Sequence, residues 1–266
     1  MAAGLAAGSL GAAEPARAPV AILKLDDVSV KTKDQAVSWR WKRVVEYVER
    51  KQLKAGCGVV CASLALDNQV YFDWLKAVHA RGRIEFWFHG WDHGVHEEEG
   101  VKYNEFNHRT YEDQKDRFER SLKLAKEKLG FEFATFGPGG GVGTPSYDST
   151  TVRVMAEVPA MRIWLFPKPL DEEGRKLVAG GKVTILDRVW AVNIESKVGV
   201  PDLARLREGF AANKTRPYVV LQGHPAMWDD ARFAEFEKIV EFLQAEGCVF
   251  MTPSEYVASV AKAGGK

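Results

Sequence analysis

Two histidines four residues apart are the residues of this sequence that point most directly to chemistry. His89 and His93 follow an apolar run at residues 84–88, and Gly90 and Gly94 come directly after each of them. Two imidazoles at this spacing on a turn can point at one cation. Because the chain has six histidines, a random arrangement would give some pair at this spacing roughly one time in ten. A metal site therefore requires partners from other segments.

Three other segments carry residues suited to hydrolytic chemistry. Asp26 and Asp27 follow an early apolar run, a glycine-rich loop spans residues 137–143, and His224 follows a late apolar run. Each has an ordinary explanation on its own, since paired aspartates usually form a solvated turn and glycine-rich loops are usually only loops. A histidine before a proline is also more often structural than catalytic. The functional interpretation depends on whether these segments meet.

Strand and helix patterns alternate about seven times along the chain, with short connections. Strands are expected at residues 20–25, 56–63, 83–88, 131–136, 161–166, 182–186, 189–194, 218–222 and 248–251. Helices are expected at residues 38–52, 70–80, 110–129, 146–158, 201–212, 229–245 and from 253 onward. This alternation predicts one α/β domain over residues 19–266, a (β/α) barrel with about seven parallel strands.

The functional loops of parallel α/β folds lie at the carboxyl ends of their strands. Asp26 and Asp27, His89 and His93, the glycine-rich loop and His224 all come at such ends. One carboxylate and two imidazoles would complete the three-ligand set of a catalytic zinc-type site that leaves a position for water. The second carboxylate and the third histidine are then candidates for base and acid.

Four motifs resemble those of the polysaccharide deacetylases of carbohydrate esterase family 4, the chitin-oligosaccharide deacetylase homology domain. They lie in the family's order at residues 25–28, 89–93, 136–139 and 221–225, and the resemblance spans about residues 20 to 260. It implies a distorted, incomplete (β/α) barrel. It also implies Asp26 as general base and His224 as general acid. Asp27, His89 and His93 would bind a divalent metal, zinc first and cobalt or nickel as alternatives.

The sequence departs from the family pattern in three of its motifs. Lys24 and Leu25 stand where the family has Thr-Phe, and Gly90 stands where it has Ser or Thr. Residues 136–138 contain no counterpart of the arginine that orients the catalytic aspartate in the family. Metal binding depends little on these positions, whereas a base that is not held in place is aimed less well.

The favoured function is a metal-dependent hydrolase that removes acetyl groups from N-acetylated carbohydrate. Two alternatives stay open: a related amidohydrolase acting on a non-sugar C–N amide, and a non-catalytic carbohydrate-binding protein that contains the metal. Substrate contacts are expected from Trp91, Trp228 and Tyr147, because aromatic rings pack well on sugar faces. Gly139 and Gly140 are expected to contribute backbone N–H groups.

Composition narrows the classes of partner. The 266 residues carry a net charge of +1, from 37 basic and 36 acidic residues, so nucleic acid is not an expected partner. No stretch approaches the ~20 apolar residues of a membrane span. Residues 1–18 are small and uncharged up to Glu14, which is typical of a secretory signal that lacks its basic start, or of a disordered tail. A secreted or periplasmic location is favoured over a cytoplasmic one, and the sequence does not indicate an oligomeric state.

Overall fold

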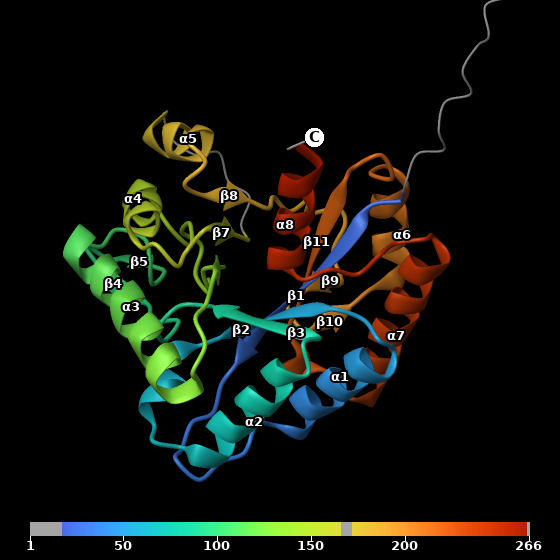
Figure 1. Ribbon diagram of the computed structural model, residues 1–266, viewed down its shortest axis with the longest axis horizontal. Coiled ribbons are helices and arrows are strands. Elements are labelled where there is room, and N and C mark those ends of the chain that lie inside the picture. The colour runs from blue at the N-terminus through green and yellow to red at the C-terminus, as the bar shows by residue number, and fades with distance from the viewer. Residues whose placement is uncertain (1–17, 166–171, 265–266) are drawn as a thin grey trace, which may run out of the picture.

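The central feature of the fold is a parallel sheet that curls into a half-barrel with helices around its outside (Figure 1). The computed structural model describes residues 18–165 and 172–264, so the signal or tail predicted at residues 1–18 lies almost wholly outside the described residues. The sheet has seven strands in the order β11-β1-β2-β3-β6-β7-β8, and each neighbouring pair is parallel. The predicted distorted, incomplete barrel is confirmed.

The strands differ greatly in length around the sheet. Those of the large sheet are β1 (Val20–Val28), β2 (Ala55–Val59), β3 (Ile84–Phe88), β6 (Thr135–Phe136), β7 (Ile163–Trp164), β8 (Thr184–Ile185) and β11 (Tyr218–Gly223). Two small antiparallel pairs lie outside it, formed by β4 (His96–Glu98) with β5 (Val101–Tyr103) and by β9 (Glu195–Lys197) with β10 (Val200–Pro201). The two-residue strands β6 to β8 leave this side of the barrel less regular than the side built from β1 to β3.

The helices begin and end largely where the capping residues of the sequence indicate. They are α1 (Trp39–Arg50), α2 (Gln69–Ala80), α3 (Tyr111–Leu124), α4 (Ser149–Glu157), α5 (Glu172–Ala179), α6 (Leu203–Ala211), α7 (Asp230–Ala245) and α8 (Pro253–Gly264). Thr110 accepts a hydrogen bond from the N–H of Asp113 at the start of α3, and Asp229 caps α7 in the same way. Within the described residues, no helix is long and apolar enough to cross a membrane.

The core lies on both faces of β1. Leu23 and Leu25 pack into the large cluster between sheet and helices, whereas Val20 and Ile22 pack into a smaller cluster inside the barrel. This alternation follows from the two-residue period of a strand. It continues to Lys24, which points to the inside of the barrel, since its side chain lies at the ring of the inner-cluster residue Trp87.

Several details of the predicted elements are wrong, among them the following three. The first strand does not stop before Asp26 and Asp27, because β1 runs on to Val28 and contains both. Residues 189–194 form no strand, and their backbone packs against α6, where a Cβ at Gly209 would lie 1.9 Å from the carbonyl oxygen of Ala191. Residues 248–251 make one isolated bridge to β1 instead of a strand.

Candidate metal centre

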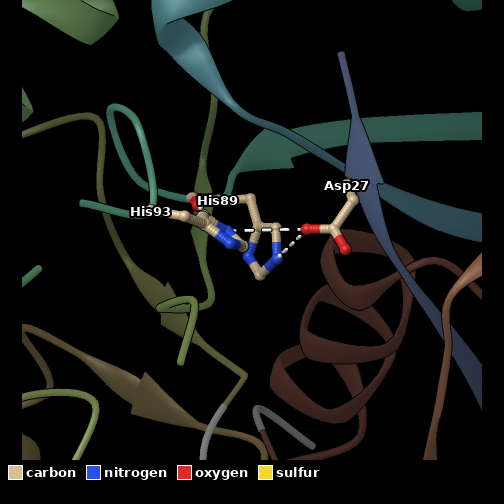
Figure 2. A group of neighbouring side chains, drawn as sticks. All are labelled: Asp27, His89 and His93. Carbon is tan, nitrogen blue, oxygen red and sulfur yellow. Dashed lines mark hydrogen bonds and ion pairs between the residues drawn. The ribbon is translucent and has the colours of Figure 1, made fainter. Parts of the chain in front are cut away.

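Asp27, His89 and His93 form a cluster of metal-ligating side chains near the carboxyl ends of β1 and β3. One ligand atom from each lies within 4.8 Å of the others. Oδ1 of Asp27 is 3.3 Å from Nε2 of His89 and 3.6 Å from Nε2 of His93, and Figure 2 shows the three side chains turned toward one another. Ligands about 2.1 Å from one tetrahedral zinc ion lie roughly 3.4 Å apart. The separations therefore fit a shared ion.

Two of these side chains stand on backbone that L-residues rarely adopt. The φ angle is 78° at Asp27 and 57° at His93. Asp27 lies where the register of β1 shifts between Leu25 and Val28, and this bulge turns it to the same cavity as Asp26. A regular strand would send adjacent side chains to opposite faces. Strained backbone of this kind costs about 1–3 kcal/mol per residue and clusters at functional sites.

The donor atoms suit a divalent metal. Nδ1 of His89 lies 2.5 Å from the carbonyl oxygen of Gly137 and donates to it, so Nε2 is the ring nitrogen that faces Asp27 and is placed to bind a metal. Burial, followed by the neighbouring His89, lowers the pKa of His93 to about 4, so the His93 ring is neutral near pH 7. Oδ1 of Asp27 is buried, and no described residue aims a well-placed hydrogen-bond donor at it.

The charge of Asp27 is consistent with the same conclusion. Burial opposes its ionised form, but His89, His93 and His224 together lower the pKa of Asp27 below its ordinary value. The cluster therefore offers one ionised carboxylate and two imidazoles. This is the donor set of many catalytic zinc sites.

Glu105 holds the loop that carries His93. Its buried carboxylate accepts hydrogen bonds from the N–H groups of Trp91 at 2.6 Å and His93 at 2.9 Å, and Arg117 lies 3.3 Å away. Gly90 has a φ of 90°, and a Cβ there would lie 2.5 Å from Oε2 of Glu105. Glycine at this position therefore leaves room for the carboxylate. The sequence gives no sign of Glu105, because it follows a hairpin, β4–β5, that has no strand pattern.

Asp26 lies on the inner face of the barrel beside the metal ligands. Its carboxylate accepts hydrogen bonds from Nζ of Lys24 at 2.6 and 2.7 Å and from Nε2 of Gln222 at 2.5 Å. Its Oδ2 is 3.7 Å from Nε2 of His89 and 3.9 Å from Nε2 of His224. Burial opposes ionisation, but the charges of Lys24, His89 and His224 lower the pKa of Asp26. Asp26 is therefore ionised and faces both histidines.

His224 follows β11 and is paired with a buried carboxylate, Glu195 in β9. Nδ1 of His224 lies 2.7 Å from Oε2 of Glu195, and the backbone N–H of His224 donates to Oε1 at 2.8 Å. Glu195 also accepts from Nε1 of Trp228 at 2.7 Å and from the N–H of Gly199 at 3.0 Å. Burial works against the charged imidazole, but the hydrogen bond to Glu195 and the charge of Asp26 raise the pKa of His224.

A cavity of about 580 Å³ opens over this cluster. Its walls include all five of the predicted catalytic and metal-binding residues, namely Asp26, Asp27, His89, His93 and His224. Gly139 and Gly140 also line it, and a Cβ at Gly139 would lie 2.3 Å from Nε2 of His93. The chain can therefore approach the histidine only because residue 139 has no side chain.

The three aromatic residues predicted to contact substrate do not line this cavity. Trp228 is fully buried beneath it and donates to Glu195. Trp91 lies under the guanidinium of Arg120, which is 3.9 Å from the ring centroid. Tyr147 is buried against Trp164. Trp228 thus contributes to the site by holding Glu195, and the other two lie outside it.

Trp190 is an aromatic wall that the sequence does not reveal. Trp190 lines the cavity and is 59% exposed, and the guanidinium of Arg188 lies 3.7 Å from its ring centroid. The strand that the sequence predicts at residues 189–194 would bury Trp190, because side chains of a strand on this side of the barrel alternate between core and helix contacts. The loop that forms instead projects Trp190 to the surface.

Comparison with known proteins gives a match at the level of the fold. No family model and no curated protein matches this sequence. Among solved structures, the carbohydrate esterase family 4 domain of a xylanase from the hindgut metagenome of Trinervitermes trinervoides is 13% identical with a TM-score of 0.57, covering 91% of this chain and 92% of that one. A family 4 acetyl xylan esterase from Clostridium thermocellum, in complex with a cobalt ion, is also 13% identical with a TM-score of 0.53, covering 89% of each chain.

Not all of these neighbours are active enzymes. A carbohydrate esterase family 4 pseudoenzyme from Bacillus anthracis is 11% identical with a TM-score of 0.53, covering 91% of this chain and 66% of that one. A mutant of a pseudoenzyme of this family with restored activity matches equally well, with the same identity and TM-score. The similarity therefore concerns the fold, and catalysis must be argued from the site. The structure matches the fold of the polysaccharide deacetylases and pseudoenzymes of carbohydrate esterase family 4.

Proposed function

We propose that this protein is a metal-dependent hydrolase that removes acetyl groups from N-acetylated carbohydrate. The observation that carries the proposal is the meeting of two carboxylates and three histidines at one cavity, in positions suited to metal binding, base and acid. The fold of the deacetylase neighbours supports it. The activity is assigned to residues 19–266, with residues 1–18 as an export signal or tail.

Asp27, His89 and His93 are the residues that would hold the metal. Zinc suits one carboxylate and two imidazoles best, with cobalt or nickel as alternatives. When bound, such an ion supplies a Lewis acid for the acetyl carbonyl and lowers the pKa of a water molecule. His93 is neutral near pH 7, and the hydrogen bond from Nδ1 of His89 to Gly137 leaves Nε2 of His89 as its metal-binding nitrogen.

Asp26 and His224 divide the proton transfers between them. Asp26, whose pKa is lowered by the charges around it, accepts a proton from the water molecule. The oxygen of that water attacks the acetyl carbon at the same time. His224, kept protonated by Glu195, donates a proton to the sugar nitrogen as the C–N bond breaks. The products are acetate and a free amine. Both groups face the same space, because their nearest atoms, Oδ2 and Nε2, are 3.9 Å apart.

Backbone and aromatic groups of the cavity complete the proposed substrate site. The N–H groups of Gly139 and Gly140 are candidates for stabilising the oxyanion. The next glycine, Gly141, is not such a candidate, because its N–H donates to Oδ1 of Asn104 at 2.8 Å. The exposed ring of Trp190 offers a flat apolar face for a sugar ring.

Acetate release from chitin oligosaccharides tests the proposal. We expect zinc-loaded protein to release acetate, and Asp26→Asn to reduce kcat by about 10²- to 10⁴-fold while zinc stays bound. Lys54→Met, which removes a surface ion pair with Glu255, is a control expected to leave kcat unchanged. Activity on small non-sugar amides alone would favour the amidohydrolase alternative. Binding of chitin oligosaccharides without hydrolysis of any substrate would favour the non-catalytic one.

A further inference from the structure

Lys24 is a buried cation in an otherwise apolar stretch of β1. Its side chain and that of Asp26 are each 1% exposed. Nζ of Lys24 donates to both carboxylate oxygens of Asp26, at 2.7 Å to Oδ1 and 2.6 Å to Oδ2. An ammonium group is very costly to bury without a counter-charge, so Lys24 and Asp26 depend on each other for their place inside the barrel.

The surroundings of Lys24 are shaped to accept its long side chain. Its Nζ lies 4.9 Å from the ring centroid of Trp87, a favourable position for a cation. A Cβ at Gly58 would lie 2.5 Å from the Trp87 ring, and a Cβ at Gly137 would lie 2.8 Å from that ring and 3.2 Å from Cε of Lys24. Glycines on two separate segments thus leave the space that Trp87 and Lys24 fill.

The contact with Lys24 fixes the direction of the Asp26 carboxylate. Both oxygens are engaged by one Nζ, and Gln222 donates to Oδ2 from β11 on the other side. Gln222 is itself held by Arg188, which donates to its Oε1. The carboxylate therefore cannot rotate freely, and its Oδ2 stays between Nε2 of His89 and Nε2 of His224.

The segment at which the family arginine is expected cannot hold Asp26 here. Residues 136–138 contain no arginine, and the ring of Phe136 packs against Phe88 and Phe118 in the core, with centroid distances of 5.3 and 4.7 Å. The charge next to Asp26 comes instead from its own strand, two residues earlier.

We propose that Lys24 is the positioning residue of the site: its two hydrogen bonds hold the carboxylate of Asp26 aimed between His89 and His224. The proposal rests on the proposed function, which gives Asp26 the role of base. Lys24 acts through Asp26, because its Nζ is buried behind the carboxylate and is not among the groups that line the cavity.

Lys24→Met tests the role in catalysis, because methionine approaches the length of lysine without its charge. We expect kcat to fall by about 100-fold or more, the contribution of an aligned base, with KM and zinc content close to wild type. The measurement is made well below the unfolding temperature, so that a loss of stability alone leaves kcat per folded molecule unchanged. Lys54→Met, which removes an ion pair of the same 2.6 Å length at the surface, is the matched control. Wild-type kcat in zinc-loaded Lys24→Met would overturn the proposal.

A second measurement does not need activity. Lys24→Met leaves a buried carboxylate without its counter-charge, so we expect Tm to fall by roughly 10 °C. Adding Asp26→Asn to Lys24→Met removes the unpaired charge, so the double variant should recover most of the lost Tm. The double variant also provides a folded protein if Lys24→Met alone fails to fold. Additive effects of the two substitutions on Tm would show that Lys24 does not hold Asp26. If the wild-type protein is inactive on every substrate, the proposed function is overturned instead. The non-additivity of the two Tm changes still decides whether Lys24 holds Asp26.

Discussion

Among single residues, Glu195 has the clearest control over the proposed chemistry, because it sets the protonation state of His224. Four donors converge on its buried carboxylate: the ring and the backbone N–H of His224, the indole of Trp228 and the N–H of Gly199. These four hydrogen bonds hold the carboxylate of Glu195 in place beside His224. The pKa of His224 is raised as a result, so the acid stays protonated to a higher pH than an ordinary histidine.

Glu195→Gln should make kcat decline at a lower pH than in the wild-type protein. The acid must be protonated to act, so kcat falls as pH rises through the pKa of His224. Removing the negative charge of Glu195 lowers that pKa, and we expect the alkaline limb of the kcat profile to move to lower pH. Glu235→Gln, which changes a carboxylate that accepts the N–H of Leu203 away from the cavity, should leave the profile in place. An unchanged alkaline limb in Glu195→Gln would show that His224 is not the acid.

Among the elements, the irregular positions of strands and loops bring the site residues together. The bulge in β1 directs Asp27 to the cavity beside Asp26, and the left-handed backbone at His93 bends its loop back toward His89. The glycine-rich loop then closes over His93, with no room for a side chain at Gly139. Regular strands and helices could not place neighbouring residues in this way.

Gly139→Ala tests the contact between the glycine-rich loop and His93. The added methyl would lie 2.3 Å from Nε2 of His93, so the ring must move away from Asp27. We expect zinc affinity to fall by about 10- to 100-fold, as when the support of a ligand is lost, with little change in apo-protein Tm. Gly141→Ala in the same loop is the matched control, because a Cβ there has no atom within 4 Å. Calorimetric titration with zinc checks both, and equal affinities would mean that the loop does not hold His93.

The same irregular positions mark where sequence patterns stop being informative. Apolar periodicity and capping residues predict β1 to β3, α1 to α3 and α7 well, because burial and caps act locally. The bulge at Asp27, the loop that exposes Trp190 and the pairing of His224 with Glu195 depend on contacts between distant segments. Motif spacing identifies the five residues that meet at the cavity, whereas the residues that hold them, Lys24, Glu105 and Glu195, carry no local signal.

For the whole molecule, the half-barrel explains why residues separated by about two hundred positions can act together. β1 lies between β11 and β2 in the sheet, so Asp26 is adjacent to Gln222 and His224 on one side and reaches His89, beyond β2, on the other. The parallel arrangement puts all of these groups at the same end of the barrel. The fold is shared with a family 4 esterase and with a family 4 pseudoenzyme, so the function depends on the site, beginning with its metal cluster.

Anomalous diffraction from a zinc-soaked crystal, collected at the zinc absorption edge, tests whether Asp27, His89 and His93 bind one ion. We expect one anomalous peak about 2.0–2.2 Å from a carboxylate oxygen of Asp27 and from one ring nitrogen each of His89 and His93, with Asp26 and His224 facing its open side. Zinc should also raise Tm in solution, because it binds only the folded cluster, and His89→Ala should abolish that rise. An absence of zinc from the cluster, or an ion held by other residues, would contradict the assignment of Asp27, His89 and His93 as the metal ligands.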